Sequence, residues 1–227
     1  MGLNIENKQL LRSIKLSMIV ENKTELEEID ELSLVNKNFI GKDLEIDLTE
    51  IYKVKNLKSL SIKFFTITDS VIESINKLEN LETIEISMCK FETTKILKSN
   101  INTMYIYTSD GINLDNFDLE KLEYIRLENS GLVDIYKLTK FLNLTRLELV
   151  NCPIISIPRI SMLKKIEELY LQEIDLKFDL EIAGLKNLKF ISLNGSKVDD
   201  KVSYINKIKE QNKNIKVRFE NINKPIQ

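Results

Sequence analysis

The sequence predicts an α/β solenoid, in which short parallel strands stack into a sheet and helical or 3₁₀ segments return along the opposite side. One arrangement of apolar residues recurs eight times along the chain, at a spacing that settles near 22 residues. Each copy has apolar residues at positions i and i+2, which places both side chains on one face of a strand. A single strand cannot bury that face alone, so the copies must stack.

The repeat is clearest in LTRLELVNCPI, which starts at Leu144. Its apolar residues are Leu144, Leu147, Leu149 and Ile154, with Cys152 between the last two. The same frame starts at eight positions: Ile29, Leu57, Leu81, Ile101, Leu122, Leu144, Ile166 and Leu188. Successive starts differ by 28, 24, 20, 21, 22, 22 and 22 residues, so the second half of the chain is the more regular.

These segments match the pattern L-x-x-L-x-L-x-x-N/C-x-L and resemble leucine-rich repeats. The stretch SGLVDIYKLTKFLNLTRLEL, from Ser130 to Leu149, is similar to the 22-residue class of bacterial internalins and of a eukaryotic phosphatase-regulatory subunit. The resemblance implies a leucine-rich-repeat horseshoe with a concave parallel β-sheet and convex 3₁₀/α segments. It also implies a protein-recognition surface.

The chain departs from this pattern at the N/C position, which never holds asparagine. Small residues that can satisfy buried turn backbone fill most copies. The position is occupied by Lys37, Phe65, Cys89, Ser109, Ser130, Cys152, Ile174 and Ser196. Lys37, Phe65 and Ile174 predict locally irregular turns.

We expect a single domain over residues 1–227. Residues 1–28 form an N-terminal cap or a degenerate repeat, in which Ser13–Val20 alternates like a strand. Residues 29–198 hold the eight repeats. Residues 199–227 form a C-terminal cap, because open solenoid ends expose core and strand edges. In it, Asp199 and Asp200 start a helix, and IKVRFE (215–220) is a last strand.

The connecting segments are expected to return along the convex side. Val71–Leu81 predicts a true helix. Two apolar stripes are predicted to point inward. They are Leu132, Ile135, Leu138 and Leu142 behind one strand, and Val202, Ile205 and Ile208 on the C-terminal helix.

The composition narrows the classes of function. Lys plus Arg is 33 and Asp plus Glu is 35, so no basic excess suggests nucleic acid. No apolar run reaches the roughly 18 residues needed to span a bilayer. The chain has no histidine, which removes the usual general base and the commonest metal ligand. We therefore expect no catalytic residue, metal or cofactor.

The predicted concave face carries the candidate binding site. Three of the five arginines and four of the seven tyrosines fall at its outward strand positions, and these residue types dominate binding hot spots. Arg126 should lie beside Glu148 one strand away. The candidate partner-binding residues are Tyr105, Tyr107, Tyr124, Arg126, Glu128, Arg146, Glu148 and Tyr170, with Phe64, Met88 and Phe190 as possible extensions. The alternative is that these side chains only support the sheet.

The predicted function is a non-catalytic protein-binding module. We expect it to be a cytoplasmic monomer that binds another protein, with neither nucleic acid nor membrane insertion. One alternative is a carboxylate-based hydrolase that uses Glu85, Glu128 and Glu148. Another is a secreted or surface adhesion protein of the internalin type, from which a signal peptide has been removed.

The two cysteines, Cys89 and Cys152, are predicted to be structural. They occupy the same turn position of two repeats whose starts lie three repeats apart, which exceeds the reach of a disulfide. With no histidine, neither a nucleophile nor a zinc ligand is expected.

Overall fold

The computed structural model describes residues 5–20, 23–36, 46–155, 157–176 and 180–220. The chain divides into two compact units, Met1–Lys121 and Leu122–Gln227, which are described separately. Lys37 and residues 221–227, for which a turn and part of the C-terminal cap are predicted, lie outside the described residues. The single-domain expectation stays a prediction.

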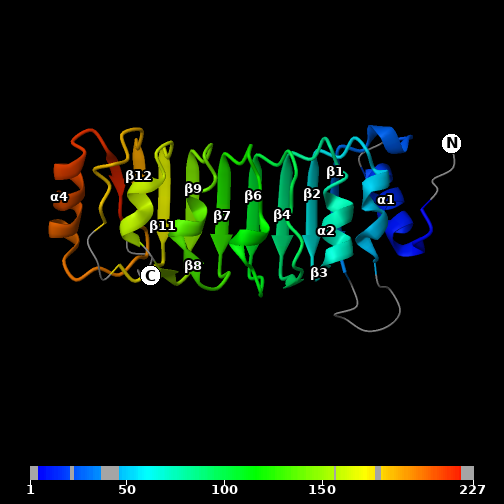
Figure 1. Ribbon diagram of the computed structural model, residues 1–227, viewed down its shortest axis with the longest axis horizontal. Helices are drawn as coiled ribbons and strands as arrows, with labels where there is room; N and C mark the ends of the chain where they lie inside the picture. The colour runs from blue at the N-terminus through cyan, green and yellow to red at the C-terminus, as the bar shows by residue number, and fades with distance from the viewer. Residues whose placement is uncertain (1–4, 21–22, 37–45, 156, 177–179, 221–227) are drawn as a thin grey trace, which may run out of the picture. The chain divides into compact units, whose positions relative to one another are not determined.

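The first unit contains four parallel strands that neighbour one another in the order β1, β2, β4, β6 (Figure 1). The connecting segments between them hold helices, 3₁₀ turns and a second pair of short strands. The elements are α1 (Lys8–Val20), η1 (Leu26–Glu28), β1 (Glu31–Val35), η3 (Leu48–Lys53), β2 (Ser59–Lys63), β3 (Thr66–Thr68), α2 (Asp69–Ile75), β4 (Thr83–Ser87), β5 (Lys90–Glu92), β6 (Thr103–Tyr107) and η4 (Leu114–Asn116).

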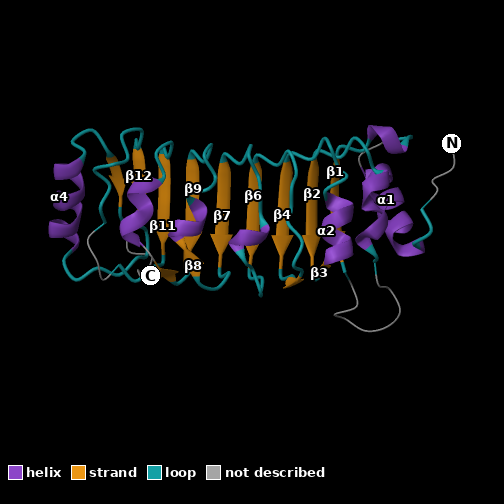
Figure 2. Ribbon diagram, in the orientation of Figure 1, coloured by secondary structure: helices purple, strands orange, loops and turns teal. Residues whose placement is uncertain are grey.

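The second unit contains five parallel strands in the order β7, β9, β11, β12, β13. Its helical segments are short apart from the last (Figure 2). The elements are β7 (Tyr124–Glu128), β8 (Val133–Asp134), α3 (Ile135–Leu138), β9 (Arg146–Val150), β10 (Ile154–Ile155), η5 (Ile157–Met162), β11 (Glu168–Gln172), β12 (Phe190–Ser192), α4 (Lys201–Gln211) and β13 (Lys216–Arg218).

All eight predicted repeats contain their strand, and side chains alternate as predicted except in β9 and β12, where outward residues are buried too. In β2, β4, β6, β7 and β11, the second and fourth residues are buried and the other three are partly exposed. Apolar residues of the return segments, such as Ile75 and Ile135, also have no exposed surface and belong to the core. The opposite side of the strands, here called the open face, carries the residues between the buried strand positions.

The turns after seven of the strands each contain a residue in the left-handed conformation at the same position. The residue before the N/C position has a positive φ in seven copies: Phe64, Met88, Thr108, Asn129, Asn151, Glu173 and Gly195. Turns that contain Phe65 or Ile174 keep this conformation, so the predicted irregularity there is wrong. The neighbouring repeat supplies the missing acceptor: Cys89 Sγ accepts from Phe65 N at 3.4 Å, and Ser196 Oγ accepts from Ile174 N at 3.1 Å.

The turn cysteines and serines are structural, as predicted. Cys152 is 3% exposed, and its thiol contacts the carbonyl oxygens of Leu127 and Val150 at 3.4 and 3.3 Å. Burial raises the pKa of the Cys89 and Cys152 thiols, which keeps them protonated. Both cysteines are free.

A second regular feature precedes the strands. Five asparagines, one of them Asn143, stand directly before the first apolar residue of a repeat, and four of them donate the side-chain amide to a backbone carbonyl of the preceding repeat. The pairs are Asn56 with Glu27, Asn80 with Lys55, Asn100 with Glu79, and Asn187 with Lys164, at 2.8 to 3.0 Å. These bonds tie successive repeats together on the side where the chain enters each strand.

The predicted ends are partly wrong. Ser13–Val20 lies in helix α1, because the buried Leu10 and Ile14 are four residues apart and share a helix face. Helix α4 and strand β13 form where predicted, with the Asp200 side chain capping α4. The buried residues of α4, however, are Tyr204 and Ile208, while Val202 is 69% exposed.

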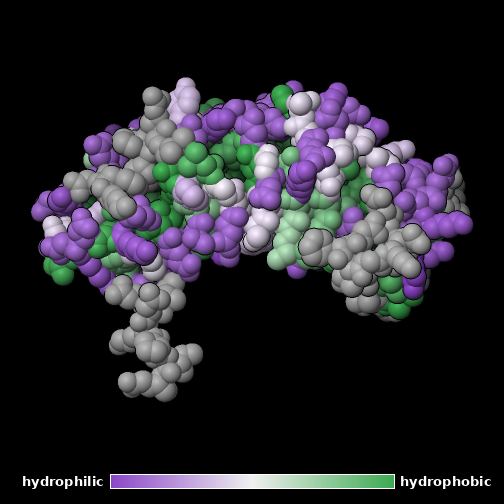
Figure 3. Space-filling model, turned by 90° about the horizontal axis from the view of Figure 1, so that it is seen from below, coloured by the Kyte–Doolittle hydropathy of each residue, from purple (hydrophilic) through white to green (hydrophobic). Residues whose placement is uncertain are grey.

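The stripe behind β7 is also partly wrong. Ile135 and Leu138 are fully buried, but Leu132 is 63% and Leu142 is 74% exposed. Helix α3 spans only Ile135–Leu138, so the helical spacing cannot carry the residues on either side of it to the same face. Figure 3, seen from the edge where the strands end, shows hydrophobic residues at the surface between hydrophilic ones.

Asp69, at the start of α2, binds the following repeat within the first unit. Its Oδ1 accepts from Thr93 Oγ1 at 2.7 Å, from Thr94 N at 2.9 Å and from Lys95 N at 3.3 Å. The hydrogen bond from Thr93 is the main cause that holds the pKa of Asp69 below its ordinary value of 3.8. The carboxylate of Asp69 therefore binds a proton more readily in the unfolded chain than in the folded one.

We predict that Asp69→Asn lowers the midpoint of thermal unfolding at pH 7 and that the difference from wild type shrinks in acid. The stabilisation is fully present above the ordinary pKa and is lost as the pH falls through the lowered folded pKa. Thermal melts between pH 7 and pH 2 measure it. A difference that is constant over this range would contradict the linkage.

Candidate functional site

Six of the eight predicted site residues lie together on the open face of the second unit. Tyr124, Arg126 and Glu128 come from β7, Arg146 and Glu148 from β9, and Tyr170 from β11. The strand register sets Arg126 opposite Glu148, as predicted, and Glu148 opposite Tyr170. Tyr105 and Tyr107 lie on β6 in the first unit.

The charged residues of this face form a continuous chain of ion pairs. Arg126 donates from Nη1 to Glu148 at 2.6 Å, and from Nη2 and Nε to Glu128 at 2.5 and 3.2 Å. Arg146 donates from Nε to Glu148 at 2.9 Å and also from Nη2. Its Nη1 lies 3.2 Å from Glu168. We call Arg126, Glu128, Arg146, Glu148 and Glu168 the arginine–glutamate network.

Aromatic rings enclose the centre of the network. The Arg146 guanidinium lies 4.7 Å from the centre of the Tyr124 ring and 4.8 Å from that of Tyr170. The two tyrosines stand on the strands on either side of β9, so the guanidinium is held between two rings. Tyr170 also packs against Phe190 of β12, with ring centres 5.2 Å apart.

Glu148 is buried, although it stands at an outward position of β9. The side chain is 3% exposed, against 28% for Arg126 and 40% for Arg146. The two arginines lie over it and take up both of its oxygens. A carboxylate out of contact with water must be paired, and here two cations pair it.

The arrangement changes the proton affinity of its members. Burial lowers the pKa of Arg126, but its hydrogen bonds to Glu128 and Glu148 outweigh that effect and raise the pKa above its ordinary value. Burial also raises the pKa of Tyr170, and so does the hydrogen bond that its hydroxyl donates to Glu168 at 3.1 Å. Arg126 therefore stays charged and Tyr170 stays neutral at physiological pH.

Sequence reasoning missed Glu168. It occupies the first outward position of its strand and pairs in register with Arg146, so the same frame that located Arg146 could have located it. It contacts Arg146 and Tyr170 and closes the network on the β11 side. Phe190, predicted as an extension, does adjoin Tyr170.

The open face of the first unit is different in character. Half of its outward positions hold small hydroxyl residues: Ser33, Ser59, Ser61, Thr83, Ser87 and Thr103. Tyr105 and Tyr107 are stacked there, with ring centres 6.3 Å apart and planes 9° from parallel. The predicted extensions Phe64 and Met88 occupy left-handed turn positions at the ends of β2 and β4.

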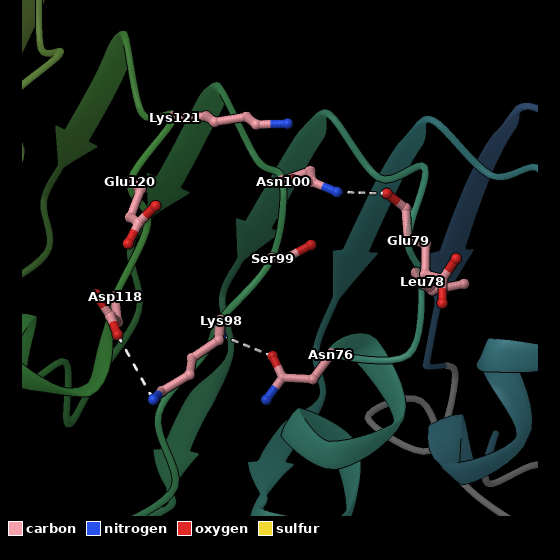
Figure 4. Close-up of a pocket in the computed structure, with 9 residues that line it drawn as sticks. All are labelled: Asn76, Leu78, Glu79, Lys98, Ser99, Asn100, Asp118, Glu120 and Lys121. Atoms are coloured by element: carbon pink, nitrogen blue, oxygen red, sulfur yellow. Dashed lines mark hydrogen bonds and ion pairs between the residues drawn. The ribbon is translucent and has the colours of Figure 1, made fainter.

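The first unit also has a pocket of about 430 Å³ beside its connecting segments (Figure 4). Lys98 lies between Asn76 and Asp118. Its backbone N donates to Asn76 Oδ1 at 2.8 Å, and its Nζ lies 3.6 Å from the Asp118 carboxylate. Asn100 belongs to the asparagine series that ties the repeats together. The buried Ser99 Oγ also lines the pocket and has no hydrogen-bond partner among the described residues. The lining as a whole suggests no chemistry.

A second hollow, of about 790 Å³, lies at the strand ends of the second unit. Its residues include Glu173, Asp175 and Asp199, yet no cluster of three or more His, Cys, Asp or Glu in the described ranges can hold a metal ion. Of the described helices, none is long and apolar enough to cross a membrane.

Comparison of the sequence with family models and with curated proteins finds no match. Solved structures do match. Internalin C2 of Listeria monocytogenes aligns with a TM-score of 0.63 at 19% identity, over 94% of this chain and 93% of that one. An internalin F structure from the same organism has a TM-score of 0.40 at 14% identity, over 95% and 89% of the chains.

The functional domain of the Listeria monocytogenes internalin InlJ has a TM-score of 0.33 at 13% identity, over 86% of this chain and 54% of that one. The likeness to internalin C2 extends over nearly all of both chains and therefore concerns the whole repeat array. Together with the eight strands in the predicted frame, it shows that the chain has the leucine-rich-repeat fold of the internalins.

Proposed function

We propose that this chain is a non-catalytic protein-binding module that recognises a partner protein on the open, concave face of its sheet. The observation that carries the proposal is the Arg146 guanidinium held between Tyr124 and Tyr170 above a buried glutamate. Side chains fixed in this way lose little freedom when a partner binds, which favours affinity.

Internalin-like structure supports a protein-interaction or adhesion type of module and does not identify a partner. The proposed site comprises Tyr124, Arg126, Glu128, Arg146, Glu148 and Tyr170 in the second unit. Tyr105 and Tyr107 form a separate proposed contact in the first unit. Tyrosine anchors are among the residues that contribute most to protein interfaces.

A hydrolase based on Glu85, Glu128 and Glu148 has less support. Glycoside hydrolysis needs one carboxyl that gives up a proton and another that can reach the substrate. Glu148 is 3% exposed, and both of its oxygens accept hydrogen bonds from arginines. Glu128 is paired with Arg126.

The test is affinity capture from the native organism, with three variants compared to wild type. We expect Tyr124→Ala/Tyr170→Ala to weaken binding about a thousandfold, because each truncated anchor costs about 2 kcal/mol. Tyr105→Ala/Tyr107→Ala reports on the first unit separately. The control is Tyr136→Ala, which removes a half-exposed tyrosine of α3.

Circular dichroism of each variant verifies the fold. If the Tyr124/Tyr170 variant captures the same proteins as wild type in equal amounts, the proposed site in the second unit is wrong. Equal loss with Tyr136→Ala would place the interaction on another surface.

A further inference from the structure

We infer that the partner presents lysine or arginine side chains, beside apolar ones, to the open face of the second unit. This inference rests on the proposed function and specifies the partner's chemistry. It reverses the expectation that arginines on a binding face attract an acidic partner. The reason lies in which atoms of the arginine–glutamate network are already hydrogen-bonded to one another.

Every nitrogen of the two arginines already contacts a glutamate, which limits what an incoming anion can bind. Nε, Nη1 and Nη2 of Arg126 are all engaged by Glu128 and Glu148. All three nitrogens of Arg146 are engaged as well, two by Glu148 and one by Glu168. Both faces of the Arg146 guanidinium are covered by tyrosine rings. An acidic partner would therefore compete with these glutamates for the guanidinium groups.

The carboxylates of Glu128 and Glu168, in contrast, can still accept hydrogen bonds. Both hydrogen bonds to Glu128 use Oε2, and the contacts of Glu168 with Arg146 and Tyr170 also use Oε2. The second oxygen of each group remains an acceptor. The side chains are 29% and 41% exposed, so a partner can reach them.

The charge balance of the network points the same way. Three glutamates face two arginines, which leaves a net charge of −1 when all five residues are ionised. The negative member that is buried, Glu148, is neutralised by both cations. The excess therefore resides on Glu128 and Glu168, the two glutamates that solvent reaches.

Apolar surface adjoins one of these glutamates. Tyr170 donates to Glu168 and packs against Phe190, so a carboxylate and two rings lie side by side. A lysine or arginine can lay its alkyl stem on such rings while its charged end reaches the carboxylate. Extended segments with alternating basic and apolar residues fit this chemistry.

The experiment uses the full chain and two acetylated, amidated heptapeptides, one alternating lysine with tyrosine and one alternating glutamate with tyrosine. Fluorescence anisotropy measures binding at physiological ionic strength. We expect the lysine peptide to bind about tenfold more tightly than the glutamate peptide. We expect Glu128→Gln/Glu168→Gln to weaken lysine-peptide binding about fivefold, as two exposed charge pairs would.

The matched control is Glu181→Gln/Glu210→Gln, which removes the same charge from two exposed sites off the open face. It should leave the affinity for the lysine peptide within about twofold of wild type. Equal losses in the two variants, an equal or higher affinity for the glutamate peptide, or no binding of either peptide would overturn the inference. The capture experiment with the tyrosine variants needs no peptide, so the proposed function is judged independently.

Discussion

Replacing Arg126 and Arg146 together by methionine is expected to destabilise the protein by about 3 kcal/mol. Methionine keeps much of the apolar stem of each arginine, so packing changes little. The loss arises because Glu148, 3% exposed, is left as a buried carboxylate without a cationic partner. Urea unfolding, followed by circular dichroism, measures the difference in free energy of unfolding.

A third substitution separates the cause from a general loss of packing. Adding Glu148→Leu to the double variant removes the unpaired charge, and we expect it to restore most of the lost stability. Arg218→Met is the control: Arg218, the last residue of β13, pairs with Glu220, and these side chains are 56% and 63% exposed. It should have no measurable effect. A triple variant no more stable than the double would refute the explanation.

The position of the network could be predicted from the sequence, and its burial could not. A spacing of 22 residues between Arg126 and Glu148 fixes them as neighbours on adjacent strands. The repeat period predicts which face of the sheet a residue occupies. It does not predict how long side chains on neighbouring strands are arranged on that face. Here two arginine side chains lie over one glutamate, and this depends on the rotamers of all three residues.

The asparagines before the strands are a second feature that the sequence makes visible. Asn56, Asn80, Asn100 and Asn187 all stand before the first apolar residue of a repeat, so their recurrence is visible in the sequence. The family pattern directs attention to the position after the strand, where asparagine is absent. In this chain an asparagine amide ties the repeats at the entry to the strand instead.

The N-terminal segment forms a helix instead of the predicted strand for a physical reason. Ser13–Val20 alternates polar and apolar residues, which favours a strand when read alone. Its first apolar residue, Ile14, pairs with Leu10 at a spacing of four, and both have no exposed surface. A helix that covers the end of the first unit buries these two residues, and their burial outweighs the strand preference of the local alternation.

Replacing Gly111 by alanine should destabilise the first unit by about 3 kcal/mol. Gly111 has φ of +72°, in the left-handed region that disfavours a side chain, and an added Cβ would lie 2.6 Å from the carbonyl oxygen of Phe91. That oxygen belongs to backbone held in place by β5, where Phe91 N donates to Asp110 O at 2.9 Å. The Cβ cannot be accommodated without moving the strand.

Gly131 provides the matched control. Its φ is +77°, but an added Cβ would have no heavy atom within 4 Å. Gly131→Ala therefore carries only the cost of the left-handed conformation, partly offset because alanine restricts the unfolded chain, and should lose at most about 1 kcal/mol. Urea unfolding of both variants measures the difference. If the two lose equal stability, contact with Phe91 does not determine why glycine stands at position 111.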